Sequence, residues 1–249
     1  MQFDEYADDY ERALAEGLAV SGEGRDYFAR GRVAWLAGLL AKRRFAPSSV
    51  LDFGCGTGSG IPLLRELTGG GDVIGLDRSS RSLAVAAREH AHERTRFLLF
   101  EEYRPSGAVD LAFSNGVFHH IPPAERPAVL DYVLRALRPG GLLALWENNP
   151  WNPGTRYVMS RIPFDRDAVP ISPPEARALL REAGFEVLRI DFLFIFPRPL
   201  RWLRALEPPL CRLPFGAQYQ VLARKPRETG VTLGTGADDT ADSPAERNR

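Results

Sequence analysis

A glycine-rich stretch, VLDFGCGTGSG at residues 50–60, constrains the fold of this chain more than any other feature. Its apolar start is typical of a buried strand, and the glycines that follow give a turn without Cβ atoms before a helix that opens at Ile61. A ligand can closely approach the backbone N–H groups of such a turn. The stretch therefore predicts a strand, a cofactor-binding turn and a helix in succession.

The spacing of the glycines separates two kinds of cofactor. The Gly-x-Gly-x-x-Gly fingerprint of dinucleotide-binding proteins needs a third glycine at Ser59 if it starts at Gly54, or at Ile61 if it starts at Gly56. Neither position is glycine. The chain instead has Asp-x-Gly-x-Gly-x-Gly, with Asp52 two residues before the first glycine. A plain turn between a strand and a helix is the alternative.

The Asp-x-Gly-x-Gly-x-Gly spacing resembles that of class I S-adenosylmethionine (SAM)-dependent methyltransferases. The resemblance covers about residues 48–146, and includes the segment SNGVFHHIP at 114–122 and Arg-Pro-Gly-Gly at 138–141. It implies a doubly wound, Rossmann-like α/β fold, with a mostly parallel seven-stranded sheet, helices on both faces and the last strand antiparallel. It also implies SAM as the cofactor.

The resemblance further implies a set of cofactor-binding residues. The glycine turn wraps the methionine and ribose part of SAM, and the acid at Asp52 helps to hold its amino group. Asp77 ends the expected strand 72–77 and can accept hydrogen bonds from both ribose hydroxyls; a carboxylate that merely complements a helix dipole is the alternative. The predicted cofactor-binding residues are Asp52, Gly54, Cys55, Gly56, Thr57, Gly58, Asp77, Arg78, Glu101, Glu102, Ser114 and Asn115.

Glu101 and Glu102 follow a third apolar run at residues 96–100. By resemblance, an acid at the end of this strand meets the exocyclic amine of adenine, and Glu101 is the first choice. The family usually has an aspartate after a small residue here, so this sequence departs from its pattern. A pair of solvated loop acids is the alternative.

Two histidines, His119 and His120, follow the fourth expected strand, 109–113. In the family this strand ends beside the transferring methyl, and ligands bind outside the carboxyl ends of parallel strands. Both histidines are candidate catalytic residues, because a neutral imidazole can take the proton of an acceptor hydroxyl. A packing or capping role is the alternative. We expect no metal site, because the histidines do not show ligand spacing with neighbouring acids.

Two segments are candidates for the acceptor pocket. Residues 1–46 resemble an N-terminal helical lid in which Tyr6, Tyr10 or Tyr27 closes over cofactor or substrate; a helix that packs beside the core is the alternative. Residues 148–172 are an insertion whose proline and asparagine residues predict an irregular start, and a structural cap over the sheet edge is the alternative. The predicted substrate-binding residues are Tyr6, Tyr10, Trp151, Arg156 and Tyr157.

Capping and hydrophobic patterns predict the remaining elements. Apolar spacing predicts a helix over 26–45, and a hydroxyl at Ser79 or Ser80 begins another. A third helix follows Pro122 and ends at the turn 138–141, before a strand at 142–146. A capping box at 172–175 begins a helix that stops at Gly184, and strands follow at 185–196 and 217–224.

Composition narrows the class of protein. The chain has 249 residues and a formal net charge of +0, which predicts one main domain and does not favour nucleic acid as a partner. Residues 47–224 are expected to form that domain, 1–46 the lid and 225–249 a disordered tail. Only two cysteines occur, and no apolar segment is long enough to span a bilayer, so a cytoplasmic setting is expected.

One stretch, residues 198–206, mixes arginines with large apolar side chains. Such a composition can give weak peripheral contact with a membrane or a lipid-linked acceptor. A short helix that closes the active-site cleft is the alternative.

The sequence thus predicts an enzyme that passes a methyl group from SAM to a small molecule by direct in-line displacement. Oxygen, nitrogen and carbon acceptors all remain open. The alternatives are a non-catalytic SAM-binding regulatory protein and, less favoured, an NAD-dependent Rossmann enzyme.

Overall fold

The computed structural model describes residues 22–162, 165 and 168–227. Seven strands form one sheet in the order β3-β2-β1-β4-β5-β7-β6. The pairs among β1 to β5 are parallel, and β7 runs antiparallel to both β5 and β6. The strands are β1 (Ser49–Phe53), β2 (Asp72–Asp77), β3 (Thr95–Leu99), β4 (Val109–Asn115), β5 (Leu137–Asn148), β6 (Glu186–Leu193) and β7 (Gln218–Arg224).

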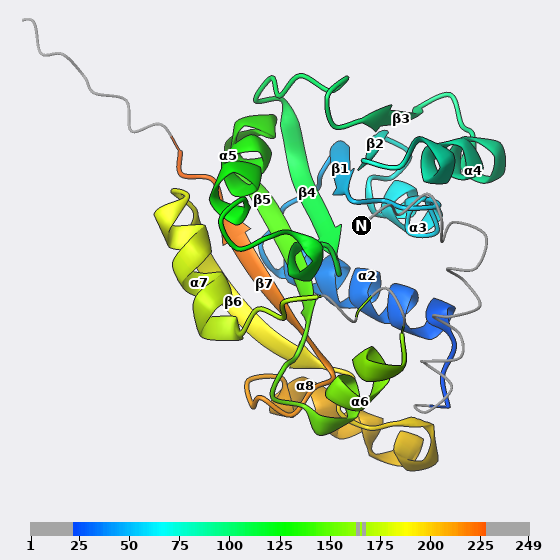
Figure 1. The fold of residues 1–249 in the computed structure, drawn as a ribbon, viewed down its shortest axis with the longest axis vertical. Helices are drawn as coiled ribbons and strands as arrows, with labels where there is room; N and C mark the ends of the chain where they lie inside the picture. Colours follow the sequence, from blue (N-terminus) through cyan, green and yellow to red (C-terminus); the bar gives the residue numbers. More distant parts are fainter. Residues whose placement is uncertain (1–21, 163–164, 166–167, 228–249) are drawn as a thin grey trace, which may run out of the picture.

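Helices cover both faces of this sheet, with α5 and α7 on one face and α2, α3 and α4 on the other (Figure 1). The helices are α2 (Arg25–Lys42), α3 (Ile61–Leu67), α4 (Ser80–His90), α5 (Arg126–Ala136), α6 (Pro153–Arg161), α7 (Pro173–Glu182) and α8 (Glu207–Leu210), with 3-10 helices η3 (Phe118–His120) and η5 (Arg198–Leu206). The expected doubly wound, Rossmann-like fold with an antiparallel last strand is confirmed.

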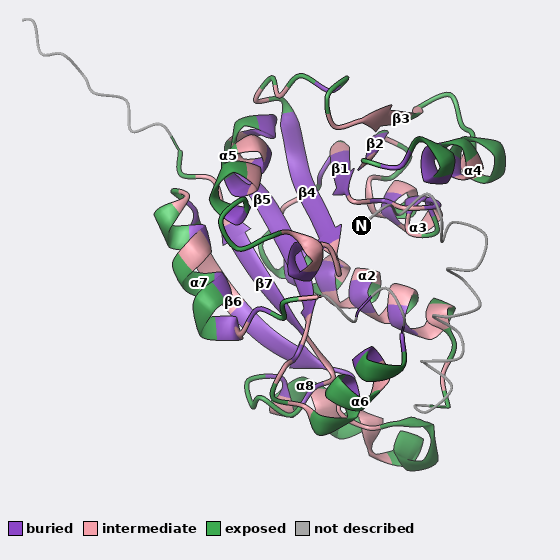
Figure 2. Ribbon diagram, in the orientation of Figure 1, coloured by how far each residue is buried: buried purple, intermediate pink, exposed green. Residues whose placement is uncertain are grey.

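The core consists of two apolar layers separated by the sheet. Along β1, Val50 packs into the layer under α2 and α3, whereas Leu51 and Phe53 pack into the layer under α5 and α7. Successive strand residues point to opposite faces, so a strand buried on both faces is apolar throughout. Figure 2 shows the central strands as the most continuously buried part of the molecule.

The sheet order reverses beside β1, which pairs with β2 on one side and with β4 on the other. The chain leaves β1 into the glycine turn and leaves β4 into η3, and the register pairs Phe53 with Ser114 near both carboxyl ends. Open α/β sheets bind ligands outside the strand ends at such a switch point. The topology therefore brings the glycine turn and the histidine pair to one place.

Several local predictions are confirmed. Ser79 caps α4 by accepting a hydrogen bond from the Ser82 N–H group, and Ser172 and Glu175 form the capping box of α7. One boundary differs: α5 ends at Ala136, and the Arg-Pro-Gly-Gly turn lies inside β5. The pairing of β4 with β5 slips in register there, which accommodates the turn within the strand.

The insertion after β5 also differs from expectation, because a regular helix begins almost at its start. The Asn152 side chain accepts a hydrogen bond from the Thr155 N–H group, and Pro153 occupies the first turn of α6. Asparagine is a good N-cap and proline suits the first helical turn, so the residues expected to break structure begin a helix.

Other expectations concern the ends of the chain, the cysteines and the membrane. The lid tyrosines Tyr6 and Tyr10, and the tail from residue 228, lie outside the described residues. Cys55 and Cys211 are buried and unpaired with each other. Within the described part of the chain, no helix has the length and hydrophobicity that a bilayer span requires.

Candidate functional site

A cavity of about 440 Å³ opens at the carboxyl ends of β1 and β4. The glycine turn and Asp52 line one part of it, and the histidines of η3 line another. Helices α2 and α6 and the segment that follows β6 contribute the remaining walls. The cavity thus connects the predicted cofactor turn with the predicted catalytic residues.

The glycine turn has the backbone that its sequence predicts. Gly54, Gly56 and Gly58 have φ angles of +77°, +55° and +79°. Residues other than glycine rarely adopt this backbone conformation. A Cβ at Gly54 would lie 2.3 Å from Val117, so the fold itself excludes a side chain there. A Cβ at Gly56 would meet no atom within 4 Å, although this residue lines the cavity. Space at Gly56 is therefore available to a ligand.

Asp52 is buried and lines the cavity together with the glycine turn. Burial and the nearby charge of Asp77 raise the pKa of the Asp52 carboxyl to about 7, with Arg32 opposing the shift. A cation placed against this carboxylate would offset its desolvation. The residue is thus suited to the amino group of the methionine part of SAM.

Asp77 is already engaged with the backbone. One carboxylate oxygen accepts a hydrogen bond from the Gly56 N–H group at 2.8 Å, and the other accepts from the Ser79 N–H group at 2.9 Å. Burial raises the pKa of Asp77, and these bonds oppose the rise. Each oxygen retains a second lone pair, and the contact of Asp77 with the ribose hydroxyls stays a prediction. Asp77 therefore also fixes the shape of the glycine turn.

The predicted cofactor residues divide into two groups. Asn115 lines the cavity together with Cys55 and Thr57 of the turn. The Asn115 Oδ1 atom is buried without a hydrogen-bond partner among the described residues, as expected of a group that meets a ligand. Ser114 Oγ is likewise without a partner among those residues. The others lie outside this cavity: Gly58, Asp77, Arg78, Glu101, Glu102 and Ser114.

The two predicted adenine contacts differ in their surroundings. Glu101 and Glu102 are both exposed at the end of β3. The Glu102 side chain folds back to accept a hydrogen bond from the Leu99 N–H group, and no such bond is found for Glu101 within the described part of the chain. Contact of either glutamate with adenine stays a prediction.

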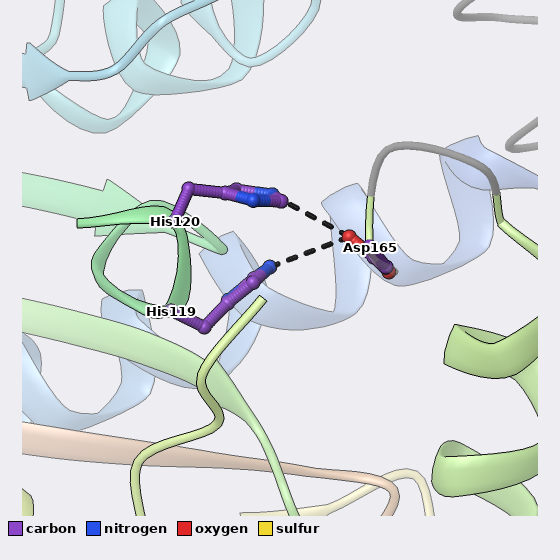
Figure 3. A group of neighbouring side chains, drawn as sticks. All are labelled: His119, His120 and Asp165. Atoms are coloured by element: carbon purple, nitrogen blue, oxygen red, sulfur yellow. Dashed lines mark ion pairs between the residues drawn. The ribbon is translucent and has the colours of Figure 1, made fainter. Parts of the chain in front are cut away.

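The histidines of η3 belong to a buried polar cluster that also contains Glu147 and Asp165. His119 Nδ1 lies 2.6 Å from Glu147 Oε2, and Glu147 Oε1 accepts a hydrogen bond from the Phe118 N–H group. His119 Nε2 and His120 Nε2 lie 3.6 Å and 3.4 Å from the same oxygen of Asp165 (Figure 3). His119, His120 and Asp165 all line the cavity.

Electrostatics separates the two rings. Burial lowers the pKa of His119, but the adjacent Glu147 and Asp165 carboxylates outweigh it and raise that pKa to about 10. Burial and the neighbouring His119 lower the pKa of His120 to about 4. Without a ligand the first ring therefore favours a proton, and the second is neutral.

Sequence reasoning missed both carboxylates of this cluster. Glu147 follows the apolar run of β5, which is itself a signal for a strand-end acid. Asp165 lies in the insertion, and backbone bonds place it: the Val169 N–H group donates to the His119 carbonyl at 2.8 Å. Arg126 adds a second tie by donating to the Val169 carbonyl.

The insertion presents a different set of side chains from the predicted one. Helix α6 turns Thr155, Val158 and Met159 toward the cavity. The predicted substrate residues Trp151, Arg156 and Tyr157 do not line it, and Trp151 and Tyr157 are 51% and 47% exposed. Arg156 and Tyr157 lie on the outer side of α6, whereas Trp151 precedes the helix and stacks against Phe192. Their contact with an acceptor stays a prediction.

At the opposite side of the cavity, Tyr27 of α2 lies among its lining residues. Its ring packs edge-on against Phe194, and the Arg204 guanidinium lies over it at 4.4 Å. Arg204 also forms an ion pair with Glu23. The η5 segment therefore closes this side of the cavity, as the cleft-closing alternative for 198–206 requires, while Trp202 remains 74% exposed.

Comparison with known proteins agrees with this architecture. Residues 50–141 match the model of the family described as Methyltransferase domain. A trans-aconitate 2-methyltransferase of an Azoarcus species is 30% identical over 116 residues, 47% of this chain and 45% of the relative. A demethylmenaquinone methyltransferase of Thermus thermophilus is 27% identical, over 80% of this chain and 84% of the relative. The chain thus matches about half the length of the trans-aconitate enzymes.

Among solved structures, the methyltransferase in the complex with the Haloferax volcanii Trm112 activator has a TM-score of 0.60. It is 23% identical, and the match covers 91% of this chain and 96% of that one. At this identity the likeness concerns the fold. The domain match over residues 50–141, the sheet order and the glycine turn beside Asp52 together support a class I SAM-dependent methyltransferase domain, a class whose cofactor is S-adenosylmethionine.

Proposed function

We propose that this protein transfers the methyl group of SAM to a small-molecule acceptor bound in the cavity. The observation that carries the proposal is the continuity of that cavity, which runs from Asp52 and the glycine turn to His119, His120 and Asp165. SAM supplies an electrophilic methyl group on a sulfonium, which is already a good leaving group. Catalysis can then come largely from orienting the acceptor in line and excluding water.

The cofactor side of the cavity is proposed to use the predicted residues. Asp52 holds the amino group of the methionine part, Gly56 leaves room for the backbone to approach the ligand, and Asn115 offers its unpartnered oxygen. Asp77 fixes the turn and receives the ribose hydroxyls with its remaining lone pairs. The first-choice adenine contact remains Glu101.

The acceptor side is proposed to use the polar cluster around η3. Its side chains orient the nucleophilic atom of the acceptor and remove its proton where one must leave. Met159, Val158 and Phe194 add apolar lining that excludes water. The relatives' names mention trans-aconitate and demethylmenaquinone, and both are small molecules, which favours an acceptor of that size.

The test uses the purified chain, a metabolite extract and SAM that carries a deuterated methyl group. The proposal predicts a small molecule that gains the labelled methyl, together with an equal amount of S-adenosylhomocysteine. An Asp52→Asn variant serves as the matched control and should form much less product. SAM binding without any labelled product across extracts of several bacteria would favour the regulatory alternative.

A further inference from the structure

The cluster beside the cavity has the composition of a metal site. His119, His120 and Asp165 place one ligand-type atom each within 4.8 Å of one another. Two imidazoles and one carboxylate are a common donor set for divalent transition metals such as Zn²⁺. Figure 3 shows both rings directed toward the Asp165 carboxylate from the other side of the site.

The distances favour a shared ion over direct hydrogen bonds. The Nε2 atoms of His119 and His120 lie 3.6 Å and 3.4 Å from Asp165 Oδ1, longer than the usual N–H···O distance of about 2.7–3.2 Å. Tetrahedral Zn²⁺ with bonds of about 2.0–2.1 Å separates its ligands by about 3.3–3.5 Å. Both separations therefore lie close to the edges of such a tetrahedron.

Glu147 supplies the outer support that metal-binding histidines generally have. It accepts from His119 Nδ1 at 2.6 Å and is itself held by the Phe118 N–H group at 2.8 Å. A proton fixed on Nδ1 leaves the Nε2 lone pair of His119 directed at Asp165. Metal-ligating histidines almost always donate their other ring N–H to a carboxylate or carbonyl in this way.

The charges at the site also call for a cation. Glu147 and Asp165 are both almost completely buried, with side chains 1% and 4% exposed. Arg126 also interacts electrostatically with Glu147, but its guanidinium donates to the carbonyls of Ile121 and Val169. A protonated His119 balances only one of the two carboxylates. With neutral imidazoles as ligands, a divalent ion would balance both carboxylates.

We propose that His119, His120 and Asp165 bind a divalent transition-metal ion of the Zn²⁺ class, with Glu147 as the positioning residue and a fourth coordination position open to the cavity. The acceptor class that this site takes is a molecule with a hydroxyl or carboxylate oxygen. With an ion bound, the histidine nitrogens would act as ligands and no longer as bases. A coordinated hydroxyl would then lose its proton to solvent more readily, and its oxygen would keep the electron pair that attacks the methyl carbon. This role for the ion rests on the proposed methyl transfer, whereas ion binding itself does not.

The test is a titration of Co²⁺ into the chelator-treated full chain, prepared without a histidine tag and without SAM. Co²⁺ is the probe because its visible absorption reports tetrahedral coordination. We expect one ion per chain, at least a 10-fold loss of affinity in His120→Gln and Asp165→Asn, and no change in the surface control His92→Gln. Acetate, a carboxylate probe, should alter the spectrum by entering the open position.

Two results would overturn the site: no one-to-one Co²⁺ binding by the wild-type chain, or equal affinity in Asp165→Asn, which preserves the shape of the side chain. SAM affinity and thermal unfolding are measured on every variant, so a loss of Co²⁺ in a folded variant is attributable to the ligands. Co²⁺ binding with no methyl transfer would leave the site standing and contradict the proposed function. Full methyl transfer in excess chelator would contradict the role of the ion in the reaction.

Discussion

His119 and Glu147, 28 residues apart in the chain, join at 2.6 Å between Nδ1 and Oε2 in the interior beside the cavity. The contact links the end of β4 with the end of β5, the two strands that carry the acceptor side of the proposed site. A buried bond of this kind orients the imidazole as well as stabilising the fold. Removal of this bond should therefore affect both the orientation of the His119 ring and the stability of the fold.

Glu147→Gln should lower the free energy of unfolding by about 1.5–3 kcal/mol, because a hydrogen bond between charged groups becomes a neutral one in a buried setting. Urea denaturation at pH 7 measures this change. Glu89→Gln, on an exposed surface pair, is the control and should change stability by less than about 0.5 kcal/mol. Equal stability of the two variants would contradict a structural role for the buried contact.

The raised pKa of Asp52 predicts a pH dependence for SAM binding. The ionised carboxylate holds the amino group, but without ligand this acid is half protonated near pH 7. SAM affinity should therefore be nearly constant above pH 8 and fall by up to about 10-fold for each pH unit below 7. Calorimetry from pH 5.5 to 8.5 measures it. An Asp52→Asn variant should bind weakly at every pH, and wild-type affinity that is flat with pH would contradict the assignment.

Asp52 should also lower the stability of the folded protein near neutral pH when no ligand is present. A carboxyl whose folded-state pKa lies above its usual value favours folding at pH values below about 4, and this contribution is lost as the pH rises through 7. At pH 8, Asp52→Asn should unfold at higher denaturant concentration than the wild type, with a gain of up to about 4 kcal/mol. At pH 4 the difference should disappear. A destabilised variant at pH 8 would contradict the shift.

Asp110 gives the opposite pH behaviour. Its carboxylate accepts hydrogen bonds from Arg138 and from Ser48 and Ser49 at the start of β1. Although burial alone would raise its pKa, these partners lower it to about 2. The stability it provides is present above pH 4 and is lost as the pH falls through 2. Wild type should therefore lose about 2 kcal/mol more than Asp110→Asn between pH 4 and pH 2, measured by urea denaturation, whereas the surface control Asp131→Asn should follow wild type.

Two glycines form a matched pair for the cofactor turn. Gly56 and Gly69 both have positive φ and both lack neighbours within 4 Å of an added Cβ, but only the first of the two lines the cavity. Alanine at either position should cost about 1–2 kcal/mol of stability through backbone strain. Gly56→Ala should also weaken SAM binding at least 10-fold, and Gly69→Ala should not. Equal SAM affinities, measured by calorimetry, would remove this glycine from the cofactor site.

Local sequence signals predicted the elements on which the cofactor site is built. The run from Val50 to Phe53, the Ser79 cap and the glycine spacing each depend on near neighbours in the chain, so their structural consequences can be read directly. Asp52 and Asn115 could be predicted for the same reason, since each stands at the end of a recognisable strand.

The acceptor side could not be predicted in the same way. Asp165 reaches His120 only through backbone ties between the insertion and η3, and no spacing in the sequence records that contact. Helix α6 begins at the N-cap Asn152. A sequence-based prediction that misses this start cannot tell which side chains of the insertion face the cavity. The cluster of His119, His120 and Asp165, proposed as a metal site, joins distant segments and is missed for the same reason.

The proposed methyl transfer requires that the turn from Asp52 to Gly58 receive the adenosyl sulfonium of SAM and not the pyrophosphate of a dinucleotide. Calorimetric titration of SAM and of NADH, each into the same wild-type preparation at pH 8, tests it directly. We expect one SAM site per chain with micromolar affinity and no measurable binding of NADH. Tighter binding of NADH than of SAM would contradict it.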